Sequence, residues 1–478
     1  MSYPSELMYG LRSIDGVSHA SFKIPAQTTN AISPNGQIRF SLPSNSIVDL
    51  RKCKMVFNVA TTGTGNTRVP ELHALVQRYQ ITAGGVPISQ GCANAHVLLQ
   101  ALKIVHREDE GDVVEEKPEI YRDRTPLLGT DLSGVQETYS AQNDATMFEL
   151  SLGTFFDSCE PRMISTDLLP QVEVELFLNS SAVVCSSAGA ALGDYATDTA
   201  NAITGDGTKD ASFTISNYSL IAPCYSVMDG MYEAMLDAVI QRQEYLPIAF
   251  REYYSYSDAF TGTFQGSNGS SCLNRLIGVF RKNGSNTQGA PVLVQGYKTG
   301  LAVNANGVGA KLQSFEHSGE KYVSKALNFT APMDVLPTMS RLVNNSDAGS
   351  AAGTATEFTS GYPKLVWRVN SVSLPNFNVP VPQFYGITKR CFDVDKTMSK
   401  SLVEYLNNRF VIAINLGLPN DSVRVKTGLN MRGSSSTIRL ETPDTTNLET
   451  TNTPDLLVFM DTTAELRIGA GKQLAVIN

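Results

Sequence analysis

Residues that could carry acid–base or metal chemistry are few and widely separated. The chain has five histidines, at His19, His73, His96, His106 and His317. None of them forms an HExxH or HxH spacing. His96 and His106 are ten residues apart on or beside one expected helix, which does not place them on one face as a pair of metal ligands. We interpret all five as surface or packing residues.

Two short glycine motifs resemble fragments of catalytic loops. Gly266-Ser267-Asn268-Gly269 lacks the GxSxG spacing of a nucleophile elbow and lies in an expected loop. Gly469-Ala470-Gly471-Lys472 resembles the end of a phosphate-binding loop, but Gln473 follows the lysine and no helix is expected there. We interpret the second motif as a hairpin turn between the last two strands.

Acidic side chains cluster at residues 108–112 and 115–116, and again at Asp393 and Asp395. Paired carboxylates are hard oxygen ligands for a cation, but the cluster at 108–116 lacks the alternating spacing of a calcium loop. We favour solvated loops for both clusters.

Three tyrosines lie close together at Tyr253, Tyr254 and Tyr256. In a strand, Tyr254 and Tyr256 share one face and Tyr253 points to the other. Carbohydrate or base stacking is one interpretation, and sheet packing or a subunit contact is the favoured one. The sequence therefore predicts no catalytic, cofactor-binding or metal-binding residue, no cofactor and no enzymatic activity.

The composition is globular but low in charge. Hydrophobic residues make up 42% and charged residues 18% of the 478-residue chain, whereas soluble domains have about 25% charged residues. Either much of the surface packs against partners, or the chain is β-rich with polar loops. The net charge is −8, and the longest basic cluster is Arg51-Lys52-Cys53-Lys54. Direct nucleic-acid binding, which needs clustered cations, is not expected.

The cysteine pattern favours a reducing compartment. The cysteines are odd in number and have no CxxC spacing, which excludes an obvious disulfide framework or zinc site. They are Cys53, Cys92, Cys159, Cys185, Cys224, Cys272 and Cys391. Residues 1–10 lack a signal-peptide pattern, and no apolar run approaches the roughly 18 residues of a membrane span.

Hydrophobic periodicity predicts mostly strands in both halves of the chain. In the first half we expect strands at 37–42, 55–59, 76–82, 147–152, 171–178 and 212–220, with helical segments at 93–106 and 231–241 and a short helix or turn near 161–168. In the second half we expect strands at 243–256, 261–265, 273–281, 323–329, 364–372, 409–416, 437–440, 456–460, 464–468 and 473–477, with a helix at 399–407. Residues 103–131 read as a long loop. The segment 180–211 has almost no large apolar side chains and is expected to be an exposed loop. We call it the first insert, and we call the Gly/Asn/Ser-rich segment 282–320 the second insert.

This pattern predicts an all-β fold of two tandem sandwiches with short helices and long surface loops. We divide the chain into an N-terminal arm (1–33), a first domain (34–235) and a second domain (236–478). A helical segment at the boundary, within 226–243, can belong to either domain.

Four segments in order resemble the double jelly-roll major capsid proteins of icosahedral double-stranded DNA viruses. These are GQIRFSLPSNSIVDLRKCKMVFNV at 36–59, YQITAGGVPISQ and the helix after it at 79–102, FELSLGTFFDSCEPRMISTDLLPQVEVELFLN at 148–179, and LVEYLNNRFVIAINLGL with MRGSSSTIRL at 402–440. They cover about a third of the chain. The family includes the coat proteins of tectiviruses, algal viruses, virophages and polinton-like viruses.

The resemblance implies two eight-stranded jelly rolls and no catalytic residues. It also implies homotrimers with a pseudo-hexagonal outline that tile an icosahedral shell in the virion, after assembly in the host cytoplasm or nucleus. Expected partners are other copies of the chain, neighbouring capsomers, and minor capsid, penton and cement proteins. The inserts would be outward-facing towers, and the arm would contact the inner side of the shell or an internal membrane.

An alternative from the residues alone is a two-domain β-sandwich adhesin or carbohydrate-binding host-recognition protein. Its composition and strand pattern would be much the same. The order of the four segments, and the lack of a visible secretion signal or fibrous stalk, favour the capsid interpretation.

Overall fold

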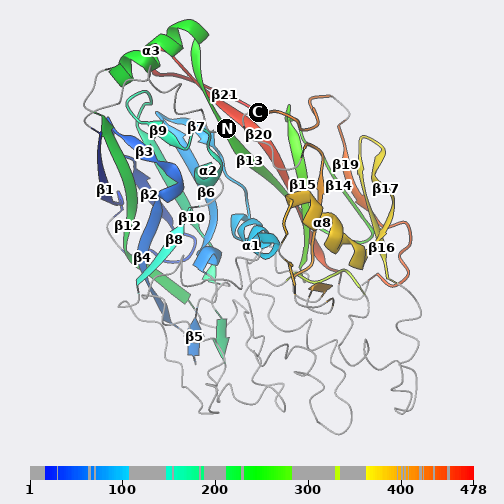
Figure 1. Cartoon of the computed structure of the whole chain (residues 1–478). Coiled ribbons are helices and arrows are strands. Elements are labelled where there is room, and N and C mark those ends of the chain that lie inside the picture. Colours follow the sequence, from blue (N-terminus) through cyan, green and yellow to red (C-terminus); the bar gives the residue numbers. More distant parts are fainter. Residues whose placement is uncertain are drawn as a thin grey trace.

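A computed structural model gives the structure of the chain. It describes residues 17–28, 31–62, 66–68, 72–106, 147–152, 155–181, 185–187, 212–227, 231–281, 329–333, 362–395, 397–399, 402, 405–406, 409–418, 423, 425–433, 436–448 and 453–478. These residues form two β-sandwiches side by side (Figure 1).

The first sandwich has one sheet with the order β1-β12-β4-β8 and a second with the order β2-β10-β6-β7. The short strands β3 and β9 extend the first sheet beside β12, and β5 pairs with β11. The bounds are β1 Val17–Pro25, β2 Gln37–Ser41, β3 Ile47–Asp49, β4 Lys54–Thr62, β5 Asn66–Arg68, β6 Val76–Ala83, β7 Val86–Ser89, β8 Met147–Ser151, β9 Met163–Ser165, β10 Val172–Leu178, β11 Cys185–Ser187 and β12 Ser212–Val227.

The second sandwich repeats this plan, with the sheets β13-β20-β15-β18 and β14-β19-β16-β17. A terminal strand, β21, pairs with β20. The bounds are β13 Tyr245–Ala259, β14 Thr263–Gly266, β15 Leu273–Arg281, β16 Lys364–Val369, β17 Val372–Pro380, β18 Val411–Asn415, β19 Ile438–Glu441, β20 Asp455–Gly469 and β21 Gln473–Ile477.

Each sandwich is an eight-stranded jelly roll. Counted along the chain, the first, eighth, third and sixth strands make one sheet, and the second, seventh, fourth and fifth make the other. This double Greek-key order is the jelly-roll topology, so the predicted fold class is confirmed.

Among the described residues, four α-helices connect or cover the sheets: α1 Ala95–His106, α2 Phe155–Ser158, α3 Met231–Gln243 and α8 Phe384–Phe392. Helices α1 and α8 each follow the fifth strand of their own sandwich, and α3 joins the two sandwiches (Figure 1). Of the helices described, none combines the length and apolar character that crossing a bilayer requires.

Along the strands, side chains that point into the core alternate with side chains that point outward. In β2, Ile38 and Phe40 point inward with no exposed surface, while the residues between them are half-buried. In β20 the residues of both faces are buried from Asp455 to Ala464, because the strand lies in the middle of its sheet and against the first sandwich.

The molecule has two distinct ends. Ser212, at the start of β12, pairs with Thr62 beside the first insert, whereas Val227, at the end of β12, pairs with Val17. A 16-residue strand spans about 50 Å. The chain before β1 and the first insert therefore leave the first sandwich at opposite ends.

Several predicted boundaries differ from the structure. For residues 161–168, where a short helix or a turn is predicted, the structure has the short strand β9 followed by a turn, and helix α2 precedes the segment. The two strands predicted at 456–460 and 464–468 are one strand, β20. The strand predicted at 364–372 breaks into a hairpin, because Asn370 and Ser371 adopt positive φ angles of 49° and 72°.

The predicted arm contains a strand. Residues 17–25 form β1, which pairs along its whole length with β12 and completes the eight strands of the first sandwich. The predicted division at 235/236 falls inside α3, and it stays a prediction. The acidic residues 108–116, the second insert, residues 1–16 and most of the first insert lie outside the described residues.

Candidate functional site: the seam between the two sandwiches

The two sandwiches meet along β13. Glu160, which follows α2 in the first sandwich, exchanges two backbone hydrogen bonds with Ala249 of β13, at 2.8 and 3.0 Å. The next residue but one, Arg251, donates its backbone N–H to Ser158 Oγ at 3.0 Å. Backbone pairing of this kind fixes the position of β13 relative to the first sandwich. We call this contact region the seam.

A buried carboxylate strengthens the seam one residue further along β13. Glu252 is 5% exposed and accepts a 2.7 Å hydrogen bond from Ser89 Oγ of β7. Burial raises the pKa of Glu252 to about 7, even though Ser89 and the backbone N–H groups of Gln90 and Gly91 favour its ionised form. The Glu252 carboxyl therefore titrates near neutral pH.

The turn that supplies these donors has a restricted shape. Gly91 has a φ of 68°, and a side chain there would collide with the backbone carbonyl of Tyr79. Only glycine fits this position without moving β6 or the start of α1.

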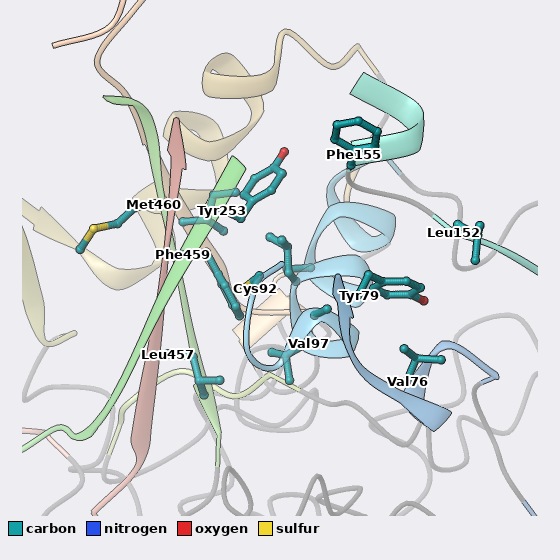
Figure 2. Close-up of a cluster of buried hydrophobic side chains, with 14 of the residues drawn as sticks. Val76, Tyr79, Cys92, Val97, Leu152, Phe155, Tyr253, Leu457, Phe459 and Met460 are labelled. Atoms are coloured by element: carbon teal, nitrogen blue, oxygen red, sulfur yellow. The ribbon is translucent and has the colours of Figure 1, made fainter. Parts of the chain in front are cut away.

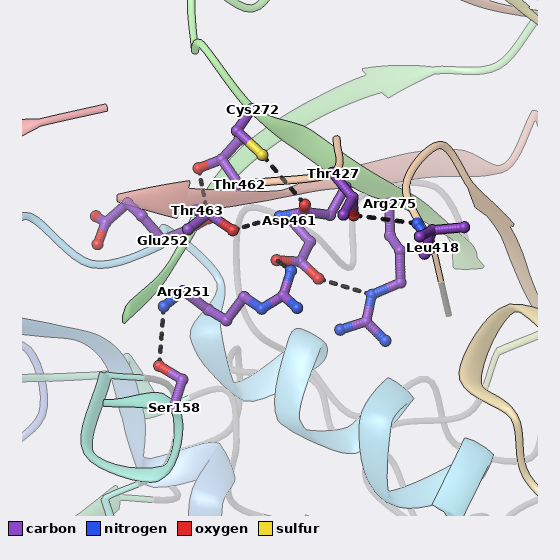
Figure 3. A network of polar contacts seen from close by, with 11 residues as sticks. Ser158, Arg251, Glu252, Cys272, Arg275, Leu418, Thr427, Asp461, Thr462 and Thr463 are labelled. Carbon is purple, nitrogen blue, oxygen red and sulfur yellow. Dashed lines mark hydrogen bonds and ion pairs between the residues drawn. The ribbon is translucent and has the colours of Figure 1, made fainter. Parts of the chain in front are cut away.

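A buried ion network lies behind β13, around Asp461 of β20 (Figure 3). Asp461 is fully buried and accepts hydrogen bonds from Arg275 Nε at 2.7 Å and Arg251 Nη1 at 3.4 Å. The Arg275 guanidinium also stacks over the ring of Phe392 in α8, 4.7 Å from its centroid. The hydroxyl of Thr462, which is next to Asp461 in β20, donates to the backbone carbonyl of Glu252 at 2.9 Å. The ion network around Asp461 and the Glu252 carboxylate therefore belong to the same pair of strands, β13 and β20.

The apolar part of the seam is aromatic. The ring centroids of Phe155 in α2 and Phe250 in β13 are 5.0 Å apart. Figure 2 shows Phe155, Cys92 and Val97 of the first sandwich facing Tyr253 and Phe459 of the second. The two cores are continuous across the seam.

The residues that directly precede the two inserts both lie near His96 of α1. His96 Nε2 is 3.4 Å from the amide nitrogen of Asn179, which directly precedes the first insert. Burial, and to a lesser extent the nearby charge of Arg281, lowers the pKa of His96 to about 3. Arg281 directly precedes the second insert. His96 is therefore neutral, and both inserts leave the molecule at the same end.

The residues weighed for chemistry in the sequence are not brought together. Asn268 forms a local turn by accepting from the Ser270 N–H at 2.7 Å. The segment 469–472 is the predicted turn between β20 and β21. Asp393 caps the C-terminus of α8 in the left-handed conformation, with φ of 50°. Tyr253 is buried in the seam, and Tyr256 donates to the Ser267 carbonyl at 2.7 Å.

Across the described ranges, no group of three or more His, Cys, Asp or Glu side chains is placed to hold a metal ion. Sequence reasoning missed Glu252 in the seam and Asp461 in the ion network behind it. The available signal was a charged residue within an otherwise strand-like, buried segment, which predicts a buried carboxylate with hydrogen-bonding or charged partners.

No family model matches the sequence, and no curated protein matches it. Solved structures do match. The Faustovirus major capsid protein is 10% identical, with a TM-score of 0.52 over 96% of this chain and 92% of that one. A chain from the Sputnik virophage is 12% identical, with a TM-score of 0.51 over 98% and 89%. A chain from the PBCV-1 virus capsid is 13% identical, with a TM-score of 0.50 over 98% of both chains. At these identities the likeness shows a shared fold, the double jelly roll.

Proposed function

We propose that this chain is a viral major capsid protein that forms homotrimers of pseudo-hexagonal outline and tiles an icosahedral shell. The observation that carries the proposal is the repetition of one eight-strand topology in two sandwiches, whose relative position is fixed by the hydrogen bonds of the seam. Three copies of such a chain supply six similar sandwiches for a closed ring. The shared fold with capsid structures over nearly the whole chain supports it.

The two ends of the molecule suit a shell with an inner and an outer side. Both inserts begin beside α1, whereas the chain before β1 leaves at the opposite end, near α3. We therefore assign the inserts to the outer surface and residues 1–16 to the inner one, where minor capsid proteins or a membrane would be met. In this proposal the protein has a structural role in the virion and no catalytic one.

Native mass spectrometry of the purified chain tests the proposal. Three chains of 51.7 kDa give a trimer of about 155 kDa, and electron micrographs of assembled material should show shells. A stable monomer that binds glycans on an array would instead support the adhesin alternative. Density maps that place both inserts on the inner face of a shell would overturn the assignment of the two ends.

A further inference from the structure

Helix α1 lies between the two sandwiches (Figure 1). It packs against β6 of its own sandwich and against β18 and α8 of the second. Eight of its twelve residues are buried, and two of these eight, His96 and Gln100, are polar. Both have no exposed surface at all. A polar side chain that is removed from bulk water in this way needs hydrogen-bond partners inside the molecule.

The hydrogen bonds of Asn179 determine where the proton of the His96 ring lies. The Asn179 side-chain oxygen accepts from the Ser180 N–H at 2.9 Å, and its amide nitrogen donates to the Ala74 carbonyl at 3.1 Å. The same amide nitrogen is 3.4 Å from His96 Nε2. Because the amide nitrogen is a donor, Nε2 must be the acceptor nitrogen of the ring. Burial lowers the pKa of His96 to about 3, so the ring is neutral and its single proton lies on Nδ1.

Three buried polar atoms on this face of α1 have no hydrogen-bond partner among the described residues. They are His96 Nδ1 and both amide atoms of Gln100, Nε2 and Oε1. Residues four apart are neighbours on one face of a helix, with Cβ atoms about 6 Å apart. The side chain of the later residue leans back toward the N-terminus, so the Gln100 amide extends toward the His96 ring. Exchanging O and N in the amide would not satisfy it, because neither atom has a partner.

The chemistry of these three atoms selects the ligand that would satisfy them. His96 Nδ1 and Gln100 Nε2 carry protons and need an acceptor, whereas Gln100 Oε1 needs a donor. A metal ion cannot accept a hydrogen bond, and an anion such as chloride cannot donate one. Water does both, and a buried water molecule commonly makes about three hydrogen bonds to polar groups of the protein.

We propose that α1 carries a binding site for buried water between His96 Nδ1 and the Gln100 amide. The water extends a chain of hydrogen bonds from Gln100 through His96 to Asn179, whose backbone N–H donates to the Leu75 carbonyl at 2.8 Å. Asn179 directly precedes the first insert, so the chain fixes the point where this insert begins relative to α1 and the second sandwich. The site belongs to the single chain and does not depend on its assembly.

A density map of the unsubstituted chain tests the site directly, at a resolution that shows ordered water elsewhere in the molecule. We expect an isolated peak about 3 Å from His96 Nδ1 and from an amide atom of Gln100. A map without this peak overturns the proposal. Continuous density for a protein side chain at hydrogen-bonding distance from these atoms also overturns it, because the partner would then be a protein group.

The direction of a stability change gives a second readout. Gln100→Met keeps the approximate length and volume of the side chain and removes its polar atoms. In a hydrated site the substitution removes hydrogen-bond partners of the water, so the unfolding constant measured in urea should rise about tenfold. In a dry site it removes two unpaired buried atoms, and the chain should become more stable. An unchanged or higher urea midpoint therefore contradicts the proposal.

Gln241→Met is the matched control, because Gln241 also lies in a helix, α3, but is exposed to solvent. Glutamine and methionine have similar helix propensities, so the midpoint of this variant should not change. All variants are compared at one protein concentration, because self-association also stabilises the folded state. An equal fall in both variants would show that the loss comes from the residue exchange itself and not from a hydrated site at Gln100.

Discussion

The Ser89 hydroxyl donates a 2.7 Å hydrogen bond to the Glu252 carboxylate and so joins β7 of the first sandwich to β13 of the second. The carboxyl is 5% exposed, and its pKa is raised to about 7 by burial. One titrating group is therefore built into the contact that sets the relative position of the two sandwiches.

Glu252 should make the stability of the chain depend on pH. The folded chain holds this proton up to about pH 7, whereas the unfolded chain releases it near 4.5. The folded state binds more protons between these values, so the contribution is fully present below about pH 4.5 and is lost as pH rises through 7. The pKa difference corresponds to roughly 3 kcal/mol. Glu252→Gln, which is neutral at every pH, should remove this dependence in urea unfolding at pH 5 and pH 8.

The comparison needs a fixed protein concentration, because self-association also stabilises the folded state. Ser89→Ala serves as a second variant. It removes a donor to the ionised carboxylate, so the loss of stability should begin at a similar pH and extend to higher pH. An unchanged pH dependence in Glu252→Gln would show that another group is responsible.

Asp461 should be essential to the second sandwich. Asp461→Ala leaves the side chains of Arg251 and Arg275, which are 13% and 21% exposed, without their shared carboxylate. Removing one partner of a buried ion pair costs roughly 3–5 kcal/mol. Thermal unfolding should show a large fall in the midpoint.

The matched control for this loss is Glu441→Ala. Its ion-pair partners, Arg368 and Arg439, each have side chains that are 44% exposed. Exposed ion pairs contribute about 0–1 kcal/mol, so the midpoint should barely change. Equal losses in the two variants would contradict the role assigned to the buried network.

The sequence predicted most strands because their periodicity directly reflects burial. The alternation around Ile38 and Phe40 predicted β2 almost to the residue. Strand β1 was missed because its residues from Ser18 to Ser21 are exposed on both faces, so the strand has no period-two signal. Helix α8 was missed because it is nine residues long and includes Gly386 and the β-branched Ile387 and Thr388.

The seam could not be predicted from the sequence for a different reason. Ser89 and Glu252 are 163 residues apart and each is unremarkable in its own segment. Their contact depends on how two folded sandwiches dock, which no local pattern encodes. The turn at Gly91 is similar, because its glycine is required by the carbonyl of Tyr79 on a preceding strand.

Gly91→Ala should destabilise the chain by about 3 kcal/mol or more, since it combines a left-handed backbone with a collision against the Tyr79 carbonyl. Urea unfolding measures the loss. Gly85→Ala is the control, because Gly85 also has a positive φ, of 82°, but no atom lies within 4 Å of an added Cβ. The control should lose only about 1 kcal/mol. Similar losses would mean that the turn relaxes without cost.

The cysteines should be almost inert in the folded chain. Cys53, Cys92, Cys159, Cys224, Cys272 and Cys391 are all buried and unpaired with one another. Burial raises the pKa of Cys53, Cys92 and Cys391 to about 12, so almost none of these thiols is ionised at pH 8. The thiolate is the reactive form. In a colorimetric thiol titration at pH 8, at most one of the seven thiols should react quickly, and all seven should react in urea. Cys185→Ser should abolish any fast phase, because Cys185 is the one cysteine outside this buried set. A fast phase that survives the substitution would contradict the burial of the other six cysteines.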